Sequence, residues 1–158
     1  MEFPKRKSPR IPKYDYSSPN YYFITICTHE KKCIFGSPNE LSLFGKIAEQ
    51  HIRNIPGFYR NVSVDKYVVM PNHVHMILVL DEKEKNPDVS LIIGQFKRGV
   101  TKEIHNVKSD LKVWQRSFHD HVIRNQSGYE KIWMYIENNP LKWEEDCFYE
   151  RKNVGEGF

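Results

Sequence analysis

Two histidines one residue apart form the first arrangement in this 158-residue sequence that could do chemistry. His73 and His75 flank Val74 and follow the turn pair Pro71-Asn72. Side chains at i and i+2 of a strand point to the same face, so the two imidazoles would lie side by side. Two neutral imidazoles are a natural start for a divalent metal site. Strand histidines that make only hydrogen bonds would give the same pattern, and the short motif alone favours that interpretation.

A second pair with the same spacing, His119 and His121, is a weaker candidate for metal binding. Asp120 between them would point to the opposite face of a strand, where a buried carboxylate is unfavourable. We therefore interpret this pair as the end of a strand or as a polar surface.

Tyr135 and Asn139 form the second arrangement of interest, because residues four apart lie on the same side of a helix. At ~100° per residue, both would stand at the border of the apolar stripe of that helix. A tyrosine at such a border commonly packs as an ordinary amphipathic side chain. The functional alternative is a nucleophile, since a metal that polarises a phosphodiester offsets the high tyrosine pKa of about 10.

Hydrophobic periodicity predicts the elements that would position these residues. The β-branched and apolar runs indicate strands, the i, i+3, i+4 patterns indicate helices, and the two-residue turn at 71–72 requires an antiparallel hairpin. Prolines at 56 and 140 should end two of the helices. The order β-α-β-β-α-β, followed by a helix that carries Tyr135, predicts an α+β ferredoxin-like fold with one antiparallel sheet. The expected strands are 21–28, 62–70, 73–80 and 113–123, and the expected helices are 42–55, 90–105 and 127–139.

The basic residues suggest a polyanionic partner. The net charge is only +4, but residues 1–13 hold five basic side chains and one acidic one, and residues 97–124 hold seven and three. Solvated surfaces would give the same charge runs. Interleaved aromatic residues could stack unpaired bases: Tyr14, Tyr16, Tyr21, Trp114 and Phe118. The candidate phosphate contacts are Lys5, Arg6, Lys7, Arg10, Lys13, Lys97, Arg98, Lys102, Arg116 and Arg124.

Composition excludes several other classes of protein. A chain with 39% hydrophobic residues is too apolar to be disordered, and its three cysteines form no C-x-x-C motif. The longest clean apolar run, at 76–80, is far below the ~20 residues of a membrane span, and the basic start lacks the apolar part of a signal peptide. We expect a cytoplasmic protein without a membrane partner, with a basic arm at 1–20, a single catalytic domain at 21–140 and a tail at 141–158.

Three stretches of this sequence resemble one known family. The HVH that follows the PN turn resembles the HUH motif, histidine-hydrophobic-histidine, of single-strand DNA transposases and replication nickases. Residues 114–143 resemble the C-terminal signature of the REP-associated tyrosine transposases, and residues 12–36 resemble their opening segment. The resemblance covers most of the chain in the expected order.

The resemblance implies a role for each candidate residue. His73 and His75 would bind a divalent metal, Mg²⁺ or Mn²⁺, and Tyr135 would be the nucleophile. Asn139 would be the third metal ligand, at a position where insertion-sequence transposases have glutamine and the REP-associated branch has asparagine. The implied reaction is metal-dependent cleavage and strand transfer of single-stranded DNA at hairpin-forming repeats, through a covalent 5′-phosphotyrosine. The implied setting is the bacterial nucleoid, as a monomer or a homodimer.

Two other functions fit the same residues. A non-cleaving module that binds hairpin DNA or RNA could use this fold, and a structural domain could simply pack its histidines. The presence of both histidines together with Tyr135 and Asn139 favours the enzyme.

Overall fold

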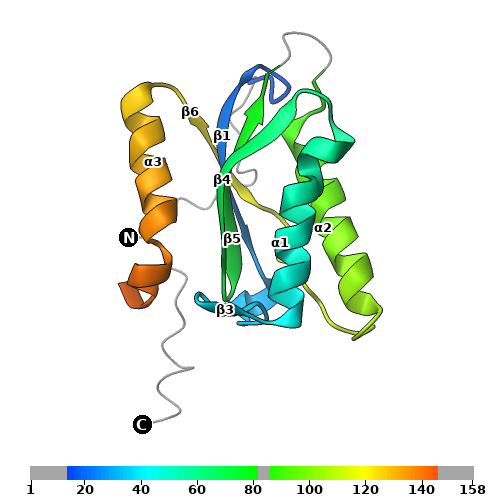
Figure 1. Ribbon diagram of the computed structural model, residues 1–158. Coiled ribbons are helices and arrows are strands. Elements are labelled where there is room, and N and C mark those ends of the chain that lie inside the picture. Colours follow the sequence, from blue (N-terminus) through cyan, green and yellow to red (C-terminus); the bar gives the residue numbers. More distant parts are fainter. Residues whose placement is uncertain (1–13, 82–85, 146–158) are drawn as a thin grey trace.

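The computed structural model describes residues 14–81 and 86–145 of the chain. Within these residues one antiparallel sheet has the strand order β4-β5-β1-β6. Helices α1 and α2 cover one face of this sheet and α3 covers the other (Figure 1). The arrangement confirms the α+β, ferredoxin-like prediction. The bounds are β1 Asn20–Cys27, α1 Leu43–Phe58, β4 Val62–Met70, β5 His73–Leu80, α2 Val89–His105, β6 His119–Ile123 and α3 Gln126–Asn138.

Short elements connect these larger ones. A 3-10 turn, η1 (His29–Lys31), follows β1, and a small two-stranded sheet of β2 (Gly36–Ser37) and β3 (Glu40–Leu41) precedes α1. A second 3-10 segment, η2 (Pro140–Glu145), follows α3. No helix within the described ranges is both long and apolar enough to cross a membrane.

Strand β5 is central and buried along its whole length. Its even-numbered residues, such as Val74 and Met76, pack into the main core beneath α1 and α2. Ile77 and Val79 face the other way and form a small second core with Ile136 of α3. The pleat of β5 therefore directs His73 and His75 to the α3 face of the sheet.

The pairing of β5 with β1 sets the neighbours of the two histidines. The register places Thr25 opposite His75 and Cys27 opposite His73. On its other side β5 forms the predicted hairpin with β4, in which Met70 pairs with His73. Because both faces of β5 are packed, a one-residue slip would move the histidines to the wrong face, so this register is strongly specified.

Helix α1 continues past the predicted stop at Pro56-Gly57 and ends at Phe58. A proline removes one backbone N–H and so one helical hydrogen bond. Pro56 is exposed in the last turn, whereas Ile52 and Ile55 before it are buried in the core. Packing of these side chains holds the turn despite the lost hydrogen bond.

Helices α2 and α3 both begin slightly before their predicted starts. The cap of α2 is Asp88, whose carboxylate accepts a hydrogen bond from the Ser90 N–H at 2.7 Å. Asn125 caps α3 by accepting from the N–H of Gly128 at 2.8 Å. In each case an Asp or Asn just before the first helical residue supplies the cap, and both residue types are preferred N-caps.

The last strand is much shorter than predicted. Residues 113–123 were expected to form one strand, but β6 starts only at His119, apart from a single bridge between Thr28 and Trp114. Side-chain bonds also tie the segment before β6 to α2: the indole N–H of Trp114 donates to the carbonyl oxygen of Lys97, and Lys97 Nζ donates to the carbonyl oxygen of Gln115. The backbone N–H of Gln115 donates to the carbonyl oxygen of Cys27 at 2.9 Å, so the segment stays beside the end of β1 without forming a regular strand.

Strand β1 is buried more completely on one face than on the other. Tyr22, Ile24 and Ile26 are fully buried under α1 and α2, while Tyr21 on the α3 face is 41% exposed and Phe23 is half-buried. Helix α3 therefore covers the second half of β1 better than the first half, and the start of the strand is open to solvent on this face.

Candidate active site

The two histidine rings lie edge to face on the α3 side of β5. Their centroids are 4.5 Å apart and their planes meet at 72°. Both residues are buried, with His73 0% and His75 1% exposed. Aromatic rings surround the pair: Phe23 and Tyr135 lie beside His75, and Trp143 stacks near His73.

A hydrogen bond fixes the proton on His73. Its Nδ1 lies 2.8 Å from Oδ1 of Asn72. The other side of that amide donates from Nδ2 to the carbonyl oxygen of Lys31 at 3.3 Å, so Oδ1 faces the imidazole. A carbonyl oxygen can only accept, so His73 Nδ1 must carry the hydrogen, and Nε2 of the neutral ring carries the lone pair.

His75 is held in a similar way from β1. Its Nδ1 lies 2.8 Å from Oγ1 of Thr25, the residue opposite it in the register. Burial, reinforced by the neighbouring His73, lowers the pKa of His75 well below the ordinary histidine value. Both imidazoles are thus oriented through Nδ1, which is the usual way in which proteins present Nε2 to a metal.

Helix α3 brings Tyr135 to His75, and Asn139 follows as the C-cap residue of this helix. The Tyr135 ring lies 5.3 Å from that of His75 and 6.2 Å from that of Phe23, between centroids, and the residue is 42% exposed. Asn139, one turn later, is 3% exposed. The helical spacing had predicted this border position for the tyrosine.

The 3-10 segment η2 completes the enclosure. Trp143 stacks on the histidine pair, with its ring centroid 6.1 Å from that of His73 and the planes at 28°. Asn139 stands in the chain between Tyr135, which contacts His75, and Trp143, which contacts His73. The buried amide therefore lies on a short stretch of backbone held to the pair at both ends.

These residues fit a divalent metal as a three-donor site. In the part of the chain that the structure describes, no group of three histidine, cysteine, aspartate or glutamate residues could hold a metal, so a site here needs the amide. The Nε2 atoms of His73 and His75 and Oδ1 of Asn139 are all buried polar atoms. Two imidazole nitrogens and an amide oxygen are neutral donors that leave coordination positions open for a substrate.

Contacts with β4 hold α3 over the sheet. Lys66 forms an ion pair with Glu137, and its Nζ lies 4.0 Å from the centre of the Trp133 ring. The hydroxyl of Tyr129 donates to Asp65 Oδ2 at 2.9 Å. These polar contacts supplement a small apolar interface in which Ile136 is the one buried α3 side chain among the described residues.

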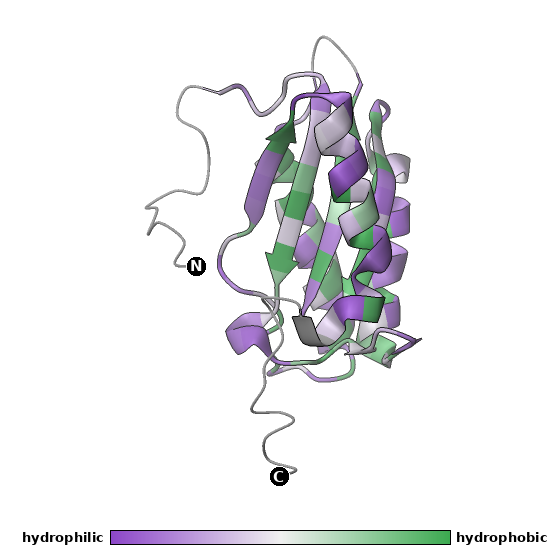
Figure 2. Ribbon diagram, turned by 90° about the vertical axis from the view of Figure 1, so that its left-hand side faces the viewer, coloured by the Kyte–Doolittle hydropathy of each residue, from purple (hydrophilic) through white to green (hydrophobic). Residues whose placement is uncertain are grey.

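The second histidine pair lies on the surface, as predicted. His119 and His121 are exposed on β6, the edge strand, whose first half is hydrophilic (Figure 2). They pair with Thr25 and Phe23 of β1 and so share the α3 face with the candidate site.

The basic candidates separate into two places. Lys97, Arg98 and Lys102 line an open groove of about 930 Å³ together with His29 and Trp114. Lys97 is half-buried there, which lowers its pKa, and its Nζ donates to the carbonyl oxygen of Gln115 at 2.7 Å. This lysine therefore also holds the segment that precedes β6.

Arg124 lies elsewhere, in a pocket beside the first turn of α3. Arg116 is exposed on the segment before β6. The remaining candidates lie outside the described residues: Lys5, Arg6, Lys7, Arg10 and Lys13.

The sequence did not identify three residues that support the site, namely Thr25, Asn72 and Trp143. Asn72 precedes His73 directly, so its adjacency was an available signal. Thr25 could be found only from the strand register, and Trp143 only from the path of η2.

The fold and site together define a ferredoxin-like α+β domain in which a central-strand histidine pair meets a tyrosine on a C-terminal helix. A family model described as "Transposase IS200 like" matches residues 16–139. The chain belongs to this family of IS200-like transposases, and the family predicted from the sequence is confirmed.

Individual relatives agree with this assignment. A Haemophilus influenzae protein without an assigned function is 35% identical over 167 residues, covering 91% of this chain and 93% of the relative. A second protein of that organism, provisionally named a REP-associated tyrosine transposase, is 24% identical over 136 residues, covering 81% of this chain and 74% of the relative.

Two solved structures share the fold. A REP-associated tyrosine transposase bound to a REP hairpin superposes with a TM-score of 0.62 at 20% identity, over 85% of this chain and 73% of that one. A provisionally assigned transposase from Deinococcus radiodurans gives a TM-score of 0.54 at 15% identity, over 82% of this chain and 97% of that one.

Proposed function

We propose that this protein cuts and rejoins single-stranded DNA beside hairpin-forming repeats, with Tyr135 as the nucleophile. The observation that carries the proposal is the contact between Tyr135 and His75, whose ring centroids lie 5.3 Å apart, with buried Asn139 one helical turn further. A tyrosine placed over two oriented, neutral imidazoles is the donor arrangement that a metal-assisted phosphoryl transfer needs.

The proposed reaction is a transesterification. The hydroxyl oxygen of Tyr135 attacks a phosphodiester phosphorus and forms a bond to it as the bond to the 3′-oxygen breaks. The tyrosine loses its proton, the departing 3′-oxygen gains one, and the 5′ end stays attached to the enzyme as a phosphotyrosine. Attack by a second 3′-hydroxyl reverses these steps and joins the strands. The number of phosphodiester-type bonds is unchanged, so no nucleotide cofactor is required.

His73, His75 and Asn139 would hold a divalent cation, Mg²⁺ or Mn²⁺. When bound, such an ion supplies Lewis-acid polarisation of the scissile phosphate. The chain itself contributes orientation: Asn72 and Thr25 fix the two rings through Nδ1, while Phe23 and Trp143 exclude water from them.

The proposed substrate is a hairpin with adjoining single strands. The solved relative that was bound to a REP hairpin has this fold, which supports a hairpin partner here. The groove lined by Lys97, Arg98 and Lys102 supplies cations for backbone phosphates. The basic arm before residue 14 is a further candidate for the same role.

A covalent-adduct assay tests the proposal. The protein is incubated with labelled hairpin DNA from the repeats that flank its gene, with Mg²⁺ or Mn²⁺, and the products are separated on a denaturing gel. An adduct that forms with the wild type and disappears in Tyr135→Phe is the expected result. Tight binding of such hairpins without any adduct would instead identify a non-cleaving hairpin-binding module.

A further inference from the structure

A second concave site opens at the end of the sheet, beside the first turn of α3. This pocket of about 400 Å³ is lined by Asn20 and Tyr21 at the start of β1, by Ile123 and Arg124 at the end of β6, and by Asn125, Gln126 and Tyr129. Its volume falls within the ~300–1,000 Å³ of small-molecule binding sites. It takes no part in the reaction proposed above.

One side of the pocket is an exposed aromatic surface. Tyr21 is 41% exposed, and its ring meets that of Tyr129 edge to face, with centroids 5.4 Å apart and planes at 85°. The Tyr129 hydroxyl is fixed by its bond to Asp65. By contrast, Tyr16 of the arm is fully packed into the core, and Trp114 is half-buried against it. Tyr21 is therefore the candidate stacking residue that remains at the surface.

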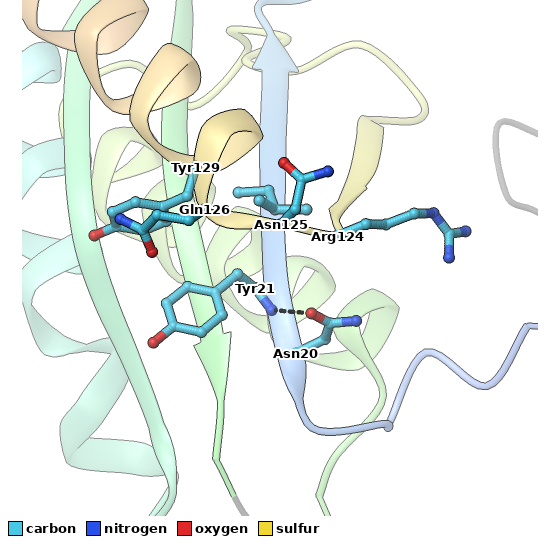
Figure 3. A pocket seen from close by; sticks show the side chains of 7 residues that line it. Asn20, Tyr21, Arg124, Asn125, Gln126 and Tyr129 are labelled. Carbon is cyan, nitrogen blue, oxygen red and sulfur yellow. Dashed lines mark hydrogen bonds between the residues drawn. The ribbon is translucent and has the colours of Figure 1, made fainter.

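The other side of the pocket is polar and cationic. Tyr21 and Arg124 extend in opposite directions from the end of the sheet, and the amide groups of Asn20 and Asn125 accompany Arg124 (Figure 3). Asn20 Oδ1 accepts from the N–H of Tyr21 at 2.9 Å, and its Nδ2 donates to the hydroxyl of Tyr14 at 3.3 Å. Guanidinium and amide groups are among the side chains that contact the phosphate and sugar groups of a DNA strand.

The pocket and the candidate active site share one face of the sheet. Tyr21, Phe23 and Thr25 all point to that face, because every second residue of a strand lies on the same side. Phe23 and Thr25 both contact His75. The four-residue step from Tyr21 to Thr25 along β1 spans ~13 Å, and the six-residue step from Tyr129 to Tyr135 along α3 spans ~9 Å. A stacked strand advances ~3.4 Å per nucleotide, so this distance corresponds to about three or four nucleotides, or fewer when the strand is extended.

We propose that this pocket binds one unpaired nucleotide of the substrate strand, with its base stacked on Tyr21 and its sugar-phosphate backbone toward Arg124. The inference rests on the proposed function for the position of the base relative to the cut. It adds a site that contacts the single strand at the end of the sheet. This site is separate from the groove lined by Lys97, Arg98 and Lys102, which is proposed to bind the hairpin.

Binding measured without metal tests the pocket independently of the chemistry. The probe is fluorescein-labelled hairpin DNA from the flanking repeats, with a short single strand on each side, measured by anisotropy in EDTA. Single abasic sites are introduced at each unpaired position in turn. Tyr21→Phe, which keeps the ring, is the matched control for Tyr21→Ala, and circular dichroism checks that both variants fold.

The expected result is one position at which loss of the base weakens wild-type and Tyr21→Phe binding by about tenfold to a hundredfold. The same abasic site should hardly weaken the binding of Tyr21→Ala any further, since this variant already lacks the ring on which the base stacks. Equal losses for wild type and Tyr21→Ala at every position would overturn the pocket. If the abasic site and Tyr21→Ala are coupled but no covalent adduct forms, the nucleotide pocket is supported and strand transfer is refuted. If an adduct forms without this coupling, strand transfer is supported and the pocket is refuted.

Discussion

The ring of Tyr135 on α3 meets the ring of His75 on β5 nearly edge-on, with centroids 5.3 Å apart and planes at 65°. One chain thus supplies both the hydroxyl and the imidazole pair, which is the cis arrangement that a monomeric enzyme would need. The exposure of Tyr135 leaves a substrate phosphate room to approach, while His75 stays buried beneath it.

Tyr135→Phe should abolish the covalent adduct and leave the fold intact. Phenylalanine keeps the ring contacts with His75 and Phe23 and removes only the hydroxyl that we propose as the attacking group. Because the side chain is 42% exposed, we expect the free energy of unfolding to change by no more than about 0.5 kcal/mol. Denaturing gels and thermal melts measure the two effects. An adduct that persists in this variant would assign the nucleophile to another residue.

Thr25→Val should weaken metal binding with little change in shape. Valine fills the same space in β1 but removes the hydroxyl that holds His75 Nδ1 at 2.8 Å. Loss of such an orienting bond typically costs about tenfold to a hundredfold in metal affinity. Titration calorimetry with Mn²⁺ measures the change, and His121→Ala, from the exposed second pair, is the control that should bind normally. Equal affinities for wild type and Thr25→Val would argue against His75 as a ligand.

Trp143 should report metal binding by its fluorescence. Its indole stacks near His73, with centroids 6.1 Å apart, so a paramagnetic Mn²⁺ at the histidines should quench its emission. In Trp143→Phe the remaining emission from Trp114 and Trp133 should respond much less. The concentration dependence of quenching should match the calorimetric affinity. Quenching that is unchanged in Trp143→Phe would place the ion elsewhere.

Arg98→Gln and Lys102→Gln should lower the salt sensitivity of hairpin binding. Each phosphate contact contributes about 0.9 to the slope of log affinity against log salt, so each substitution should make the slope shallower by about 1. Both side chains are exposed in the groove beside α2, so neither change should destabilise the fold. Lys97→Gln should differ, because that side chain also bonds the carbonyl of Gln115. An unaltered slope would remove the groove from the DNA interface.

Tyr129 should ionise at a higher pH than an ordinary tyrosine, and its contribution to stability should disappear at alkaline pH. Burial, followed by its bond to Asp65, raises the pKa of Tyr129 to about 12. A raised folded-state pKa means that this stability is complete below pH ~10 and is lost as pH rises toward 12. Melting curves of wild type and Tyr129→Phe should therefore differ at pH 8 and converge as pH rises through that window. Ultraviolet titration of the tyrosines locates the ionisation directly.

The predictable part of the site was the part encoded by local periodicity. The spacing of His73 and His75 fixed their common face, and the helical spacing of Tyr135 and Asn139 fixed their place at the border of the apolar stripe. The shorter β6 and the longer α1 could not be foreseen, because bonds from Lys97 and packing of Ile55 override the local tendencies of those segments.

The sequence by itself determined the strand and helix order, the common face of the histidine pair and the helix that carries the tyrosine, since each follows from period-two or 3.6-residue spacing. Only the tertiary structure decided that Thr25 orients His75, that Trp143 covers His73 and that Tyr21 opens onto a pocket with Arg124. These contacts depend on strand register and on how α3 and η2 dock, which join residues far apart in the chain and leave no periodic trace in the sequence.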